Sequence, residues 1–515
     1  LAGGASDETG VRLDGHPLQD PFHLLGLLGA FNVAALDRAD VLIHHLPPAL
    51  GGSLSGVVAM RTRAPSAAPL REATVSLLSG GVTLGGGGLP GGIDVLAAAR
   101  TTYLDRVAAS VAPDLPRAGF RDALVRLGRS WGGWRGELLG FTTNDRYADA
   151  DFAEVAAYDP LQWGESMVGA RLDREAAGAR LALRASYNVA GSHLDERAAG
   201  GANFIDSERG WLSAAAEGEL SREAWRAQGG VAVDAREHTQ RWVARGLIDE
   251  VFSPNTPAEY EGTEAVTVAA VHGEGSLRLG SCLTATLGAR VSVTSEGAFP
   301  APSALLTCEP RSGLRLEAAV ERRHQFAAQL EEPIEGSISP PIFLLARPRI
   351  ADVAAVSTAW SAAWGELGAQ LFTRRYPDRT RLPARAPGAE RDEIGRDFPA
   401  FERVTGSAAG LALRGTASGL NRVAQGSYTF QRAGETFDGS TTPTGWDAPH
   451  ALSLLVSAAL GRRWIGSTVY QARSGRATTP VRARIFEPDL RVADSNSLVP
   501  RYLYGERNSI RVPAY

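Results

Sequence analysis

Several features that would point to other protein classes are scarce in this chain of 515 residues. It has only two cysteines, Cys282 and Cys308, so no disulfide framework is indicated, although these two could form a bridge. It lacks any run of about 18 apolar residues, which excludes a membrane-spanning helix. The net charge is −4 and no basic patch stands out, which argues against nucleic-acid binding.

Catalytic and metal-binding patterns are also lacking. The nine histidines show no spacing typical of a metal site, and no Ser-His-Asp arrangement emerges. We therefore predict that the chain is not an enzyme and needs neither a cofactor nor a resident metal. A secretion signal is not visible at Leu1, and we expect this to reflect sequence that precedes this residue.

What the sequence does contain is a repeated alternation of apolar and polar side chains. From about residue 71 to residue 474 it recurs in segments of roughly ten residues, the length of a membrane-spanning strand. A period of two residues is typical of β-strands. The predicted strands are 72–79, 81–87, 92–104, 120–131, 134–146, 163–174, 178–191, 209–221, 224–238, 262–277, 280–294, 301–309, 313–326, 351–362, 365–376, 402–415, 418–432, 450–461 and 464–474.

The polar faces of these strands carry charges, which a packed soluble core would not tolerate. The alternation therefore predicts an all-β transmembrane barrel with a wet lumen and an apolar outer band. We expect eight charged side chains to face the lumen, as a solvated wall that docks an inner domain or, alternatively, as the lining of a translocation path. They are Arg180, Arg184, Arg226, Asp234, Arg236, Arg315, Glu317 and Glu321.

Loop lengths give the orientation of the strands. Short turns follow every second strand, and long polar loops follow most of the others, as in barrels with short periplasmic turns and long outer loops. The first strand then starts at the periplasmic side. The segment 475–515 is expected to be one more outer loop. Because the predicted number of strands is odd, we expect that they cannot close a barrel without further strands beyond Tyr515.

The N-terminal segment has a different pattern, with short apolar pieces broken by glycine and proline. We predict a small mixed α/β unit over residues 1–65, followed by the barrel over residues 66–515. Asp14-Gly15 is a turn signal between short strands. Residues 31–43 are expected to form a helical turn that leads into a strand, and residues 57–63 another strand.

This segment resembles the second half of the plug domain of TonB-dependent outer-membrane receptors. The residues that carry the resemblance are Asp7-Glu8-Thr9, Leu13-Asp14-Gly15, Pro21-Phe22-His23-Leu24, Phe31-Asn32, Pro48, Gly51-Gly52 and Leu54-Ser55-Gly56-Val57. Ala49-Leu50 departs from the family pattern, which has an aromatic residue before the glycine pair. Residues 98–105 and 505–515 resemble barrel segments of the same family. The resemblance implies 22 antiparallel strands in the complete barrel, about 19 of them present, and a chain truncated at both ends.

Within the plug, the resemblance places residues 44–48 near an apex. We expect substrate contacts from His44, His45, Pro47 and Pro48. We expect a structural role for the plug motif residues, with His23 as a satisfied interior histidine rather than a metal ligand and the glycines in tight turns. These residues are Asp14, Gly15, Pro21, Phe22, His23, Gly51, Gly52, Ser55 and Gly56.

The resemblance implies a function and its partners. The expected function is active import of a scarce nutrient across the bacterial outer membrane, such as a ferric siderophore, cobalamin or a glycan. The expected partners are TonB with its inner-membrane energy complex, a small-molecule or metal-chelate substrate and outer-membrane lipid. The alternative is a ligand-binding surface receptor or adhesin barrel without energised transport. A passive porin is disfavoured because it would need no plug.

Overall fold

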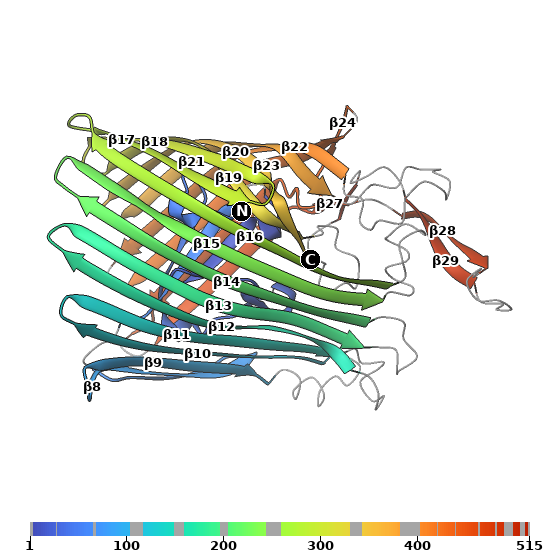
Figure 1. The fold of residues 1–515 in the computed structure, drawn as a ribbon, viewed down its shortest axis with the longest axis horizontal. Coiled ribbons are helices and arrows are strands. Elements are labelled where there is room, and N and C mark those ends of the chain that lie inside the picture. Colours follow the sequence, from blue (N-terminus) through green and yellow to red (C-terminus); the bar gives the residue numbers. More distant parts are fainter. Residues whose placement is uncertain are drawn as a thin grey trace.

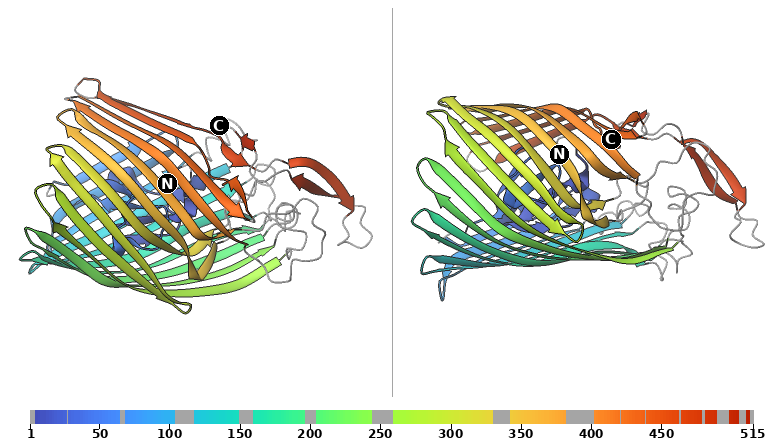
Figure 2. Two further views of the ribbon diagram at one scale, coloured as in Figure 1. Left: turned by 90° about the horizontal axis from the view of Figure 1, so that it is seen from above. Right: turned by 45° about the horizontal axis from the view of Figure 1, so that its top comes forward.

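A computed structural model shows a large barrel of tilted strands around the N-terminal segment (Figures 1 and 2). It describes residues 4–26, 28–64, 68–103, 117–148, 159–195, 204–243, 259–329, 342–381, 402–419, 421–437, 439–461, 464–478, 481–488, 498–504 and 510–512.

Each predicted strand corresponds to one strand of the barrel wall. The wall strands are β7 (Leu70–Val75), β8 (Ser79–Leu89), β9 (Ile93–Thr102), β10 (Arg117–Trp131), β11 (Trp134–Ala148), β12 (Asp159–Ala176), β13 (Ala179–Asp195), β14 (Phe204–Ser221), β15 (Trp225–Val243), β16 (Glu259–Arg278), β17 (Leu283–Thr294), β18 (Gly297–Arg311), β19 (Leu314–Gln329), β20 (Ile342–Ala362), β21 (Gly365–Arg381), β22 (Glu402–Gly419), β23 (Arg422–Phe437), β25 (His450–Ala459) and β26 (Ile465–Arg473).

Several strands extend beyond their predicted bounds at the end of the barrel with the long loops. β20 starts at Ile342 rather than at 351, and β14 starts at Phe204 rather than at 209. The short β24 (Ser440–Pro443), which pairs with the upper part of β23, was not predicted. Beyond the apolar band, at the end with the long loops, both faces of a strand can contact water. The alternation of apolar and polar side chains, which reveals a strand in the sequence, is therefore lost there.

The expectation that an odd number of strands cannot close the ring is wrong for this structure. The wall is a closed barrel in which β26 lies next to β7. Every consecutive pairing from β7 to β26 is antiparallel, so these two strands run in the same direction. Parallel neighbours can hydrogen-bond almost as well as antiparallel ones, which allows one such seam.

The end of the chain forms small sheets outside the ring. β27 (Arg476–Thr478) pairs with β30 (Ile510–Val512), and β28 (Val481–Pro488) pairs with β29 (Leu498–Tyr504). The β28–β29 hairpin lies beyond the end of the barrel that is opposite the short turns (Figure 1). This is the end at which we expected residues 475–515 to form an outer loop.

The N-terminal segment, which we call the plug and define as residues 4–63, lies inside the barrel (Figures 1 and 2). Its sheet has the strand order β2-β1-β6-β5. The plug elements are η1 (Ser6–Glu8), β1 (Thr9–Leu13), β2 (His16–Leu18), β3 (Phe22–His23), η2 (Leu24–Gly26), β4 (Leu28–Gly29), η3 (Val33–Ala35), β5 (Leu36–Leu42), η4 (Pro48–Leu50) and β6 (Gly56–Thr62).

The helical part of the plug consists of 3-10 turns, and the described plug residues include no α-helix. The predicted helical turn is η3, which Asn32 caps by accepting a hydrogen bond from the amide of Ala34 at 3.0 Å. Closely spaced glycines and prolines keep these segments shorter than the length at which an α-helix becomes stable. The predicted turn at Asp14-Gly15 joins β1 to β2, and both residues have positive φ angles of 50° and 91°.

The two faces of the wall differ in polarity, as the alternation predicts. Large apolar side chains remain exposed on the outside, where they can contact lipid. Examples are Val125, Leu138, Val168, Leu212, Val231, Val271, Leu287, Val320, Val356 and Leu371. Buried polar side chains from the same strands face inward, such as Arg126, Asn188, Gln240, Arg290 and Arg374. In the described part of the chain, no helix has both the length and the apolar character needed to cross a bilayer.

Apolar packing fixes one side of the plug against β9 to β12. The cluster joins plug residues Leu13, Leu18, Phe31 and Met60 to wall residues Leu96, Leu124, Leu139, Phe141 and Met167. The rings of Phe31 and Phe141 stack with their centroids 5.2 Å apart. The remaining contacts of the plug with the wall are mainly polar, and they form the candidate site described below.

The alternation makes a testable prediction for two neighbouring residues of β20. Val356 is 60% exposed on the outer face, whereas the hydroxyl of Ser357 points inward and donates to Glu317 at 3.2 Å. We expect Val356→Arg to lower the free energy of unfolding in lipid by about 2–4 kcal/mol, because a charge then faces the apolar band. The matched control Ser357→Arg should cost less than about 1 kcal/mol. Urea-induced unfolding in vesicles measures both, and equal losses would contradict the assigned faces.

Candidate functional site

The charged side chains buried most deeply lie where the plug meets the wall. Arg349, Arg374 and Arg379 are among the largest fully buried side chains of the described residues, and all three come from β20 and β21. They surround Glu8, a fully buried residue at the end of η1. Buried charges are costly unless they are paired, so this arrangement constrains how the plug can sit.

Both oxygens of Glu8 are used. Oε1 lies 3.1 Å from an Nη2 atom of Arg349 and 3.1 Å from Nη2 of Arg379. Oε2 accepts hydrogen bonds from the hydroxyls of Tyr376 and Ser55, each at 2.7 Å. Burial by itself raises the pKa of the Glu8 carboxyl, but the charges of Arg379, Arg349 and Arg374 and the Ser55 hydroxyl outweigh it and hold the pKa at about 2. Glu8 is therefore ionised at any physiological pH.

The arginine Arg379 also contacts a segment from the long-loop end of the barrel. Its guanidinium lies 4.0 Å from the ring centroid of Trp446 and 5.0 Å from that of Tyr376. Trp446 sits between β24 and β25, which both pair with β23. Asp447 anchors this segment by accepting the amide of Ala433 at 2.8 Å. The Arg379 side chain thus contacts both Glu8 of the plug and the segment between β24 and β25.

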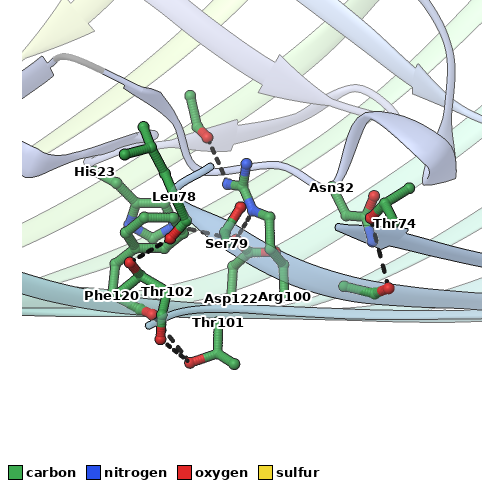
Figure 3. Close-up of polar contacts among 12 residues, drawn as sticks. His23, Asn32, Thr74, Leu78, Ser79, Arg100, Thr101, Thr102, Phe120 and Asp122 are labelled. Carbon is green, nitrogen blue, oxygen red and sulfur yellow. Dashed lines mark hydrogen bonds and ion pairs between the residues drawn. The ribbon is translucent and has the colours of Figure 1, made fainter. Parts of the chain in front are cut away.

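A second buried cluster surrounds His23, which is fully buried (Figure 3). Nδ1 lies 2.6 Å from Oδ2 of Asp145, and Nε2 lies 3.2 Å from Oδ2 of Asp122. The ring stacks on Phe120 with a centroid distance of 4.3 Å. Arg100 donates to Asp122 at 2.7 Å and to the carbonyl of Gly29 in the plug at 2.7 Å.

Two carboxylates around one imidazole favour its protonated form. Burial by itself lowers the pKa of His23, but the hydrogen bonds and charges of Asp122 and Asp145 outweigh it and raise the pKa above the ordinary value of 6.5. The structure thus gives His23 hydrogen-bond partners on both ring nitrogens. Of the neighbouring motif residues, Pro21 is buried and Phe22 is 48% exposed.

A third set of contacts is made by wall carboxylates that accept backbone amides of the plug. Glu165 on β12 accepts the amides of Gln19 at 3.0 Å and Asp20 at 2.9 Å. Glu321 on β19 accepts the amide of Leu46 at 2.9 Å. Asp145 accepts the amide of Leu24 at 2.9 Å. Because these bonds go to backbone atoms, they recognise the path of the plug chain rather than its side chains.

Wall arginines make the complementary contacts to plug carbonyls. Arg323 donates to the carbonyls of Leu54 at 3.0 Å and Ile43 at 2.7 Å. Arg374 donates to the carbonyl of Ser55 at 3.0 Å. Hydrogen bonds with one charged partner are stronger than neutral ones, and water can replace each of them. These contacts hold the folded plug against the wall.

The predicted apex residues 44–48 lie against the wall. Nε2 of His45 is 3.3 Å from Oε2 of Glu274, and His45 has a positive φ of 52°. The His44 ring is 5.8 Å from that of Phe372, and burial together with the charges of Arg323 and Arg374 lowers the pKa of His44 to about 3. Substrate contact by His44, His45, Pro47 and Pro48 stays a prediction.

The loop after these residues approaches β17 closely. Pro48 is buried, and its carbonyl accepts a hydrogen bond from Arg290 at 3.3 Å. A Cβ atom on Gly51 would lie 2.5 Å from Nε of Arg290, so a larger residue there would displace this arginine side chain. Gly52 has a φ of 98°, a conformation that favours glycine. Gly56 begins β6, beside Ser55 of the Glu8 cluster.

The eight predicted lumen residues divide into two groups. Arg180, Arg226 and Arg315 form ion pairs within the wall, to Asp173 at 3.0 Å, to Glu219 at 2.8 Å and to Glu317 at 2.7 Å, and their side chains are about half exposed. These three arginines are paired along the wall itself, and the role expected for them stays a prediction.

The other group lies near the plug. Glu321 binds the plug amide described above, and Arg184 pairs with Glu217 and lies against Gly15. Asp234 accepts the indole N–H of Trp211 at 2.9 Å, and Arg236 stacks on the same ring at 3.9 Å.

Sequence reasoning missed several wall residues of these clusters that are buried, and one that is partly exposed, Trp446. The buried ones are Arg349, Arg374, Tyr376, Arg379, Asp122, Glu165 and Arg323. Alternation places Arg374 and Tyr376 on the same face of a predicted strand, so their inward orientation was available from the sequence. Their burial could not be predicted, because a solvated lumen arginine and a buried one occupy the same position in the alternation of apolar and polar residues. Glu8 is part of the motif that carries the family resemblance, but the sequence pattern gives it no role.

Comparisons with solved structures identify the fold. The chain is similar to the siderophore receptor PirA from Acinetobacter baumannii, with 10% identity, a TM-score of 0.59 and coverage of 93% of this chain and 86% of that one. It is similar to a mutant of the ferric enterobactin receptor PfeA from Pseudomonas aeruginosa, with 11% identity, a TM-score of 0.66 and coverage of 93% and 80%. It is also similar to the ferric citrate transporter FecA, with 12% identity, a TM-score of 0.61 and coverage of 98% of this chain and 87% of that one.

These likenesses confirm the predicted fold, a large barrel with a small N-terminal plug. The names of these similar proteins describe receptors and a transporter. No protein-family model matches the sequence, and no curated protein matches it.

The Glu8 cluster predicts a strong effect of a single substitution. Glu8→Gln leaves the three surrounding arginines without their shared counter-charge, so we expect the docking of the plug to weaken by roughly 3–5 kcal/mol. Protease digestion of the plug at increasing urea concentration, with the barrel still folded, measures this. The control Glu72→Gln breaks a half-exposed pair with Arg63 at 3.6 Å and should cost less than about 1 kcal/mol. Equal effects would show that the cluster does not hold the plug.

The His23 cluster predicts a pH dependence. Because its pKa is raised in the folded state, His23 contributes stability below its unfolded pKa of about 6.5 and loses it as the pH rises through the higher folded value. Plug docking should therefore weaken as the pH rises above about 6.5, and His23→Gln should remove this slope. The control His16→Gln should leave the slope intact, because burial and nearby arginines lower the pKa of His16 to about 4. Plug proteolysis across this range tests both variants.

Proposed function

We propose that this chain is part of a TonB-dependent receptor that imports a scarce small molecule, such as a metal chelate, across the bacterial outer membrane. The observation that carries the proposal is a folded plug held inside a closed, apolar-walled barrel by polar contacts. A barrel closed in this way excludes passive flow of large solutes. Transport then requires that the plug move, and movement requires energy from outside the barrel.

The plug–wall contacts support a plug that moves without being destroyed. Charge-assisted hydrogen bonds dominate the contacts, and on release water can satisfy the same donors and acceptors. The main apolar contact lies on one side, against β9 to β12. A plug held by a continuous apolar core would expose that core on moving, at a cost of about 25 cal/mol per Å². The polar contacts around the rest of the wall make displacement less costly.

The similar structures support the substrate class in general terms. Their names describe receptors for siderophores and for ferric enterobactin and a transporter of ferric citrate. Sequence identities of 10–12% carry the fold and not the cargo. We therefore propose iron chelates as the first class to test, with cobalamin and oligosaccharides as the alternatives.

The proposal predicts energised uptake by the full-length protein that contains this chain. In cells that lack their own receptors, we expect saturable binding of one ligand class and uptake only when TonB is present. Binding without uptake in cells that contain TonB would instead support a surface receptor or adhesin. Ligand entry into the cells that needs no TonB and does not saturate would support a channel. Radiolabelled ferric chelates, cobalamin and oligosaccharides are the probes.

A locked plug gives a matched control for this assay. Nδ2 of Asn32 in the plug donates to Oγ1 of Thr83 on β8 at 3.1 Å, so cysteines at these two positions could be joined. The Asn32→Cys/Thr83→Cys variant, with the native cysteines replaced by serine, should bind ligand but not transport it until a reductant is added. Asn32→Cys alone should transport throughout. Unchanged uptake by the oxidised double variant would contradict release of the plug from β8.

A further inference from the structure

The two cysteines of this chain meet at one end of the barrel. Cys282 ends the turn between β16 and β17, and Cys308 lies near the end of β18. Their Sγ atoms are 2.7 Å apart, and both residues are partly exposed. The two residues are 26 positions apart in the chain, and the pairing of β17 with β18 brings the thiols together.

Backbone hydrogen bonds hold both cysteines in place. The amide of Leu279 donates to the carbonyl of Leu283 at 2.8 Å and closes the turn that contains Cys282. Leu283 lies directly opposite Cys308 in the β17–β18 register. The amide of Glu309 donates to the carbonyl of Cys282 at 3.0 Å. The thiols therefore meet in the folded chain without a rearrangement of the backbone.

The regular pairing of β18 ends at Cys308 on both of its edges. With β17 it ends at the pair Leu283–Cys308. With β19 the register is irregular between Cys308 and Arg311, which pairs with Leu314. A covalent link at Cys308 would therefore secure the wall at the point where the regular pairing of β18 ends.

We propose that Cys282 and Cys308 are a disulfide-forming pair, which joins the start of β17 to the end of β18. In this reaction each thiol loses its proton, the two sulfurs form one bond, and two electrons pass to a disulfide-containing oxidant of the thiol oxidoreductase class. The oxidant leaves as a dithiol after a mixed-disulfide intermediate. The pair lies at the end of the barrel with the short turns. The periplasmic, oxidising location of this end rests on the proposed function.

The bridge would act on a segment of the wall that the plug uses. Arg290, which binds the carbonyl of Pro48 at 3.3 Å, belongs to the β17–β18 hairpin that the bridge would close. Gly288 of the same hairpin lies against Pro48, because a Cβ atom there would be 2.8 Å from Cγ of this proline. The disulfide therefore fixes the base of the hairpin against which the loop containing Pro48 docks.

Mass spectrometry of the full-length protein tests the proposal. The protein is isolated from outer membranes, denatured with N-ethylmaleimide and without reductant, and digested. We expect a peptide pair linked through Cys282 and Cys308 and no adduct on either residue; prior reduction should give two adducts and remove the linked pair. Adducts on both residues without reduction would overturn the proposal. The Cys282→Ser variant is the control, and it should show one adduct at Cys308 with or without reductant.

The result is independent of the transport assay. Energised uptake by a protein whose two thiols are free would overturn the disulfide and leave the proposed function in place. A disulfide in a protein that neither binds nor transports any ligand would overturn the proposed function and leave the disulfide in place. Free thiols in native membranes that form the bridge only after addition of a chemical oxidant would also count against the proposal, because the reaction requires an oxidant of the compartment.

Discussion

The structure depends on buried charges at the contact between the plug and the wall. Glu8 of the plug has no access to solvent, and its charge is compatible with burial only because Arg349, Arg374 and Arg379 surround it. Since the arginines belong to the wall and the carboxylate to the plug, neither part is satisfied without the other. This mutual requirement selects one position of the plug, whereas apolar packing alone tolerates shifts of a small domain within a wide barrel.

The same contacts explain how firm docking can be reversible. Wall carboxylates such as Glu165 and Glu321 accept plug amides, and wall arginines such as Arg323 donate to plug carbonyls. In a dry interior such bonds are strong, but when water enters, each group can hydrogen-bond to solvent instead. Arg379 adds a link to the long-loop end of the barrel, since it stacks on Trp446 while it pairs with Glu8. A change at Trp446 therefore alters the surroundings of the charge that holds the plug.

The outside and the inside of the wall meet different demands, and a strand satisfies both because its side chains alternate. Val356 faces outward and Ser357 inward, one residue apart. This alternation allowed the barrel to be predicted from the sequence, and it placed residues such as Arg315 and Glu321 on the lumen side. It failed where both faces of a strand can meet water, at the long-loop ends of β14 and β20, and it missed the short β24. It also could not reveal the closure, because parallel contact between β7 and β26 leaves no mark in the alternation.

The sequence by itself determined the strands, their two faces, the end at which the short turns lie and the Asp14-Gly15 turn, because each depends on residues close together in the chain. Tertiary structure decided which polar side chains are buried and paired. Glu8 meets Arg379 across 371 positions, and His23 meets Asp122 and Asp145 on two strands of the wall. Those partners depend on the depth and rotation of the plug within the ring. The depth and rotation of the plug result from many weak contacts between distant parts of the chain, so no local sequence pattern predicts them.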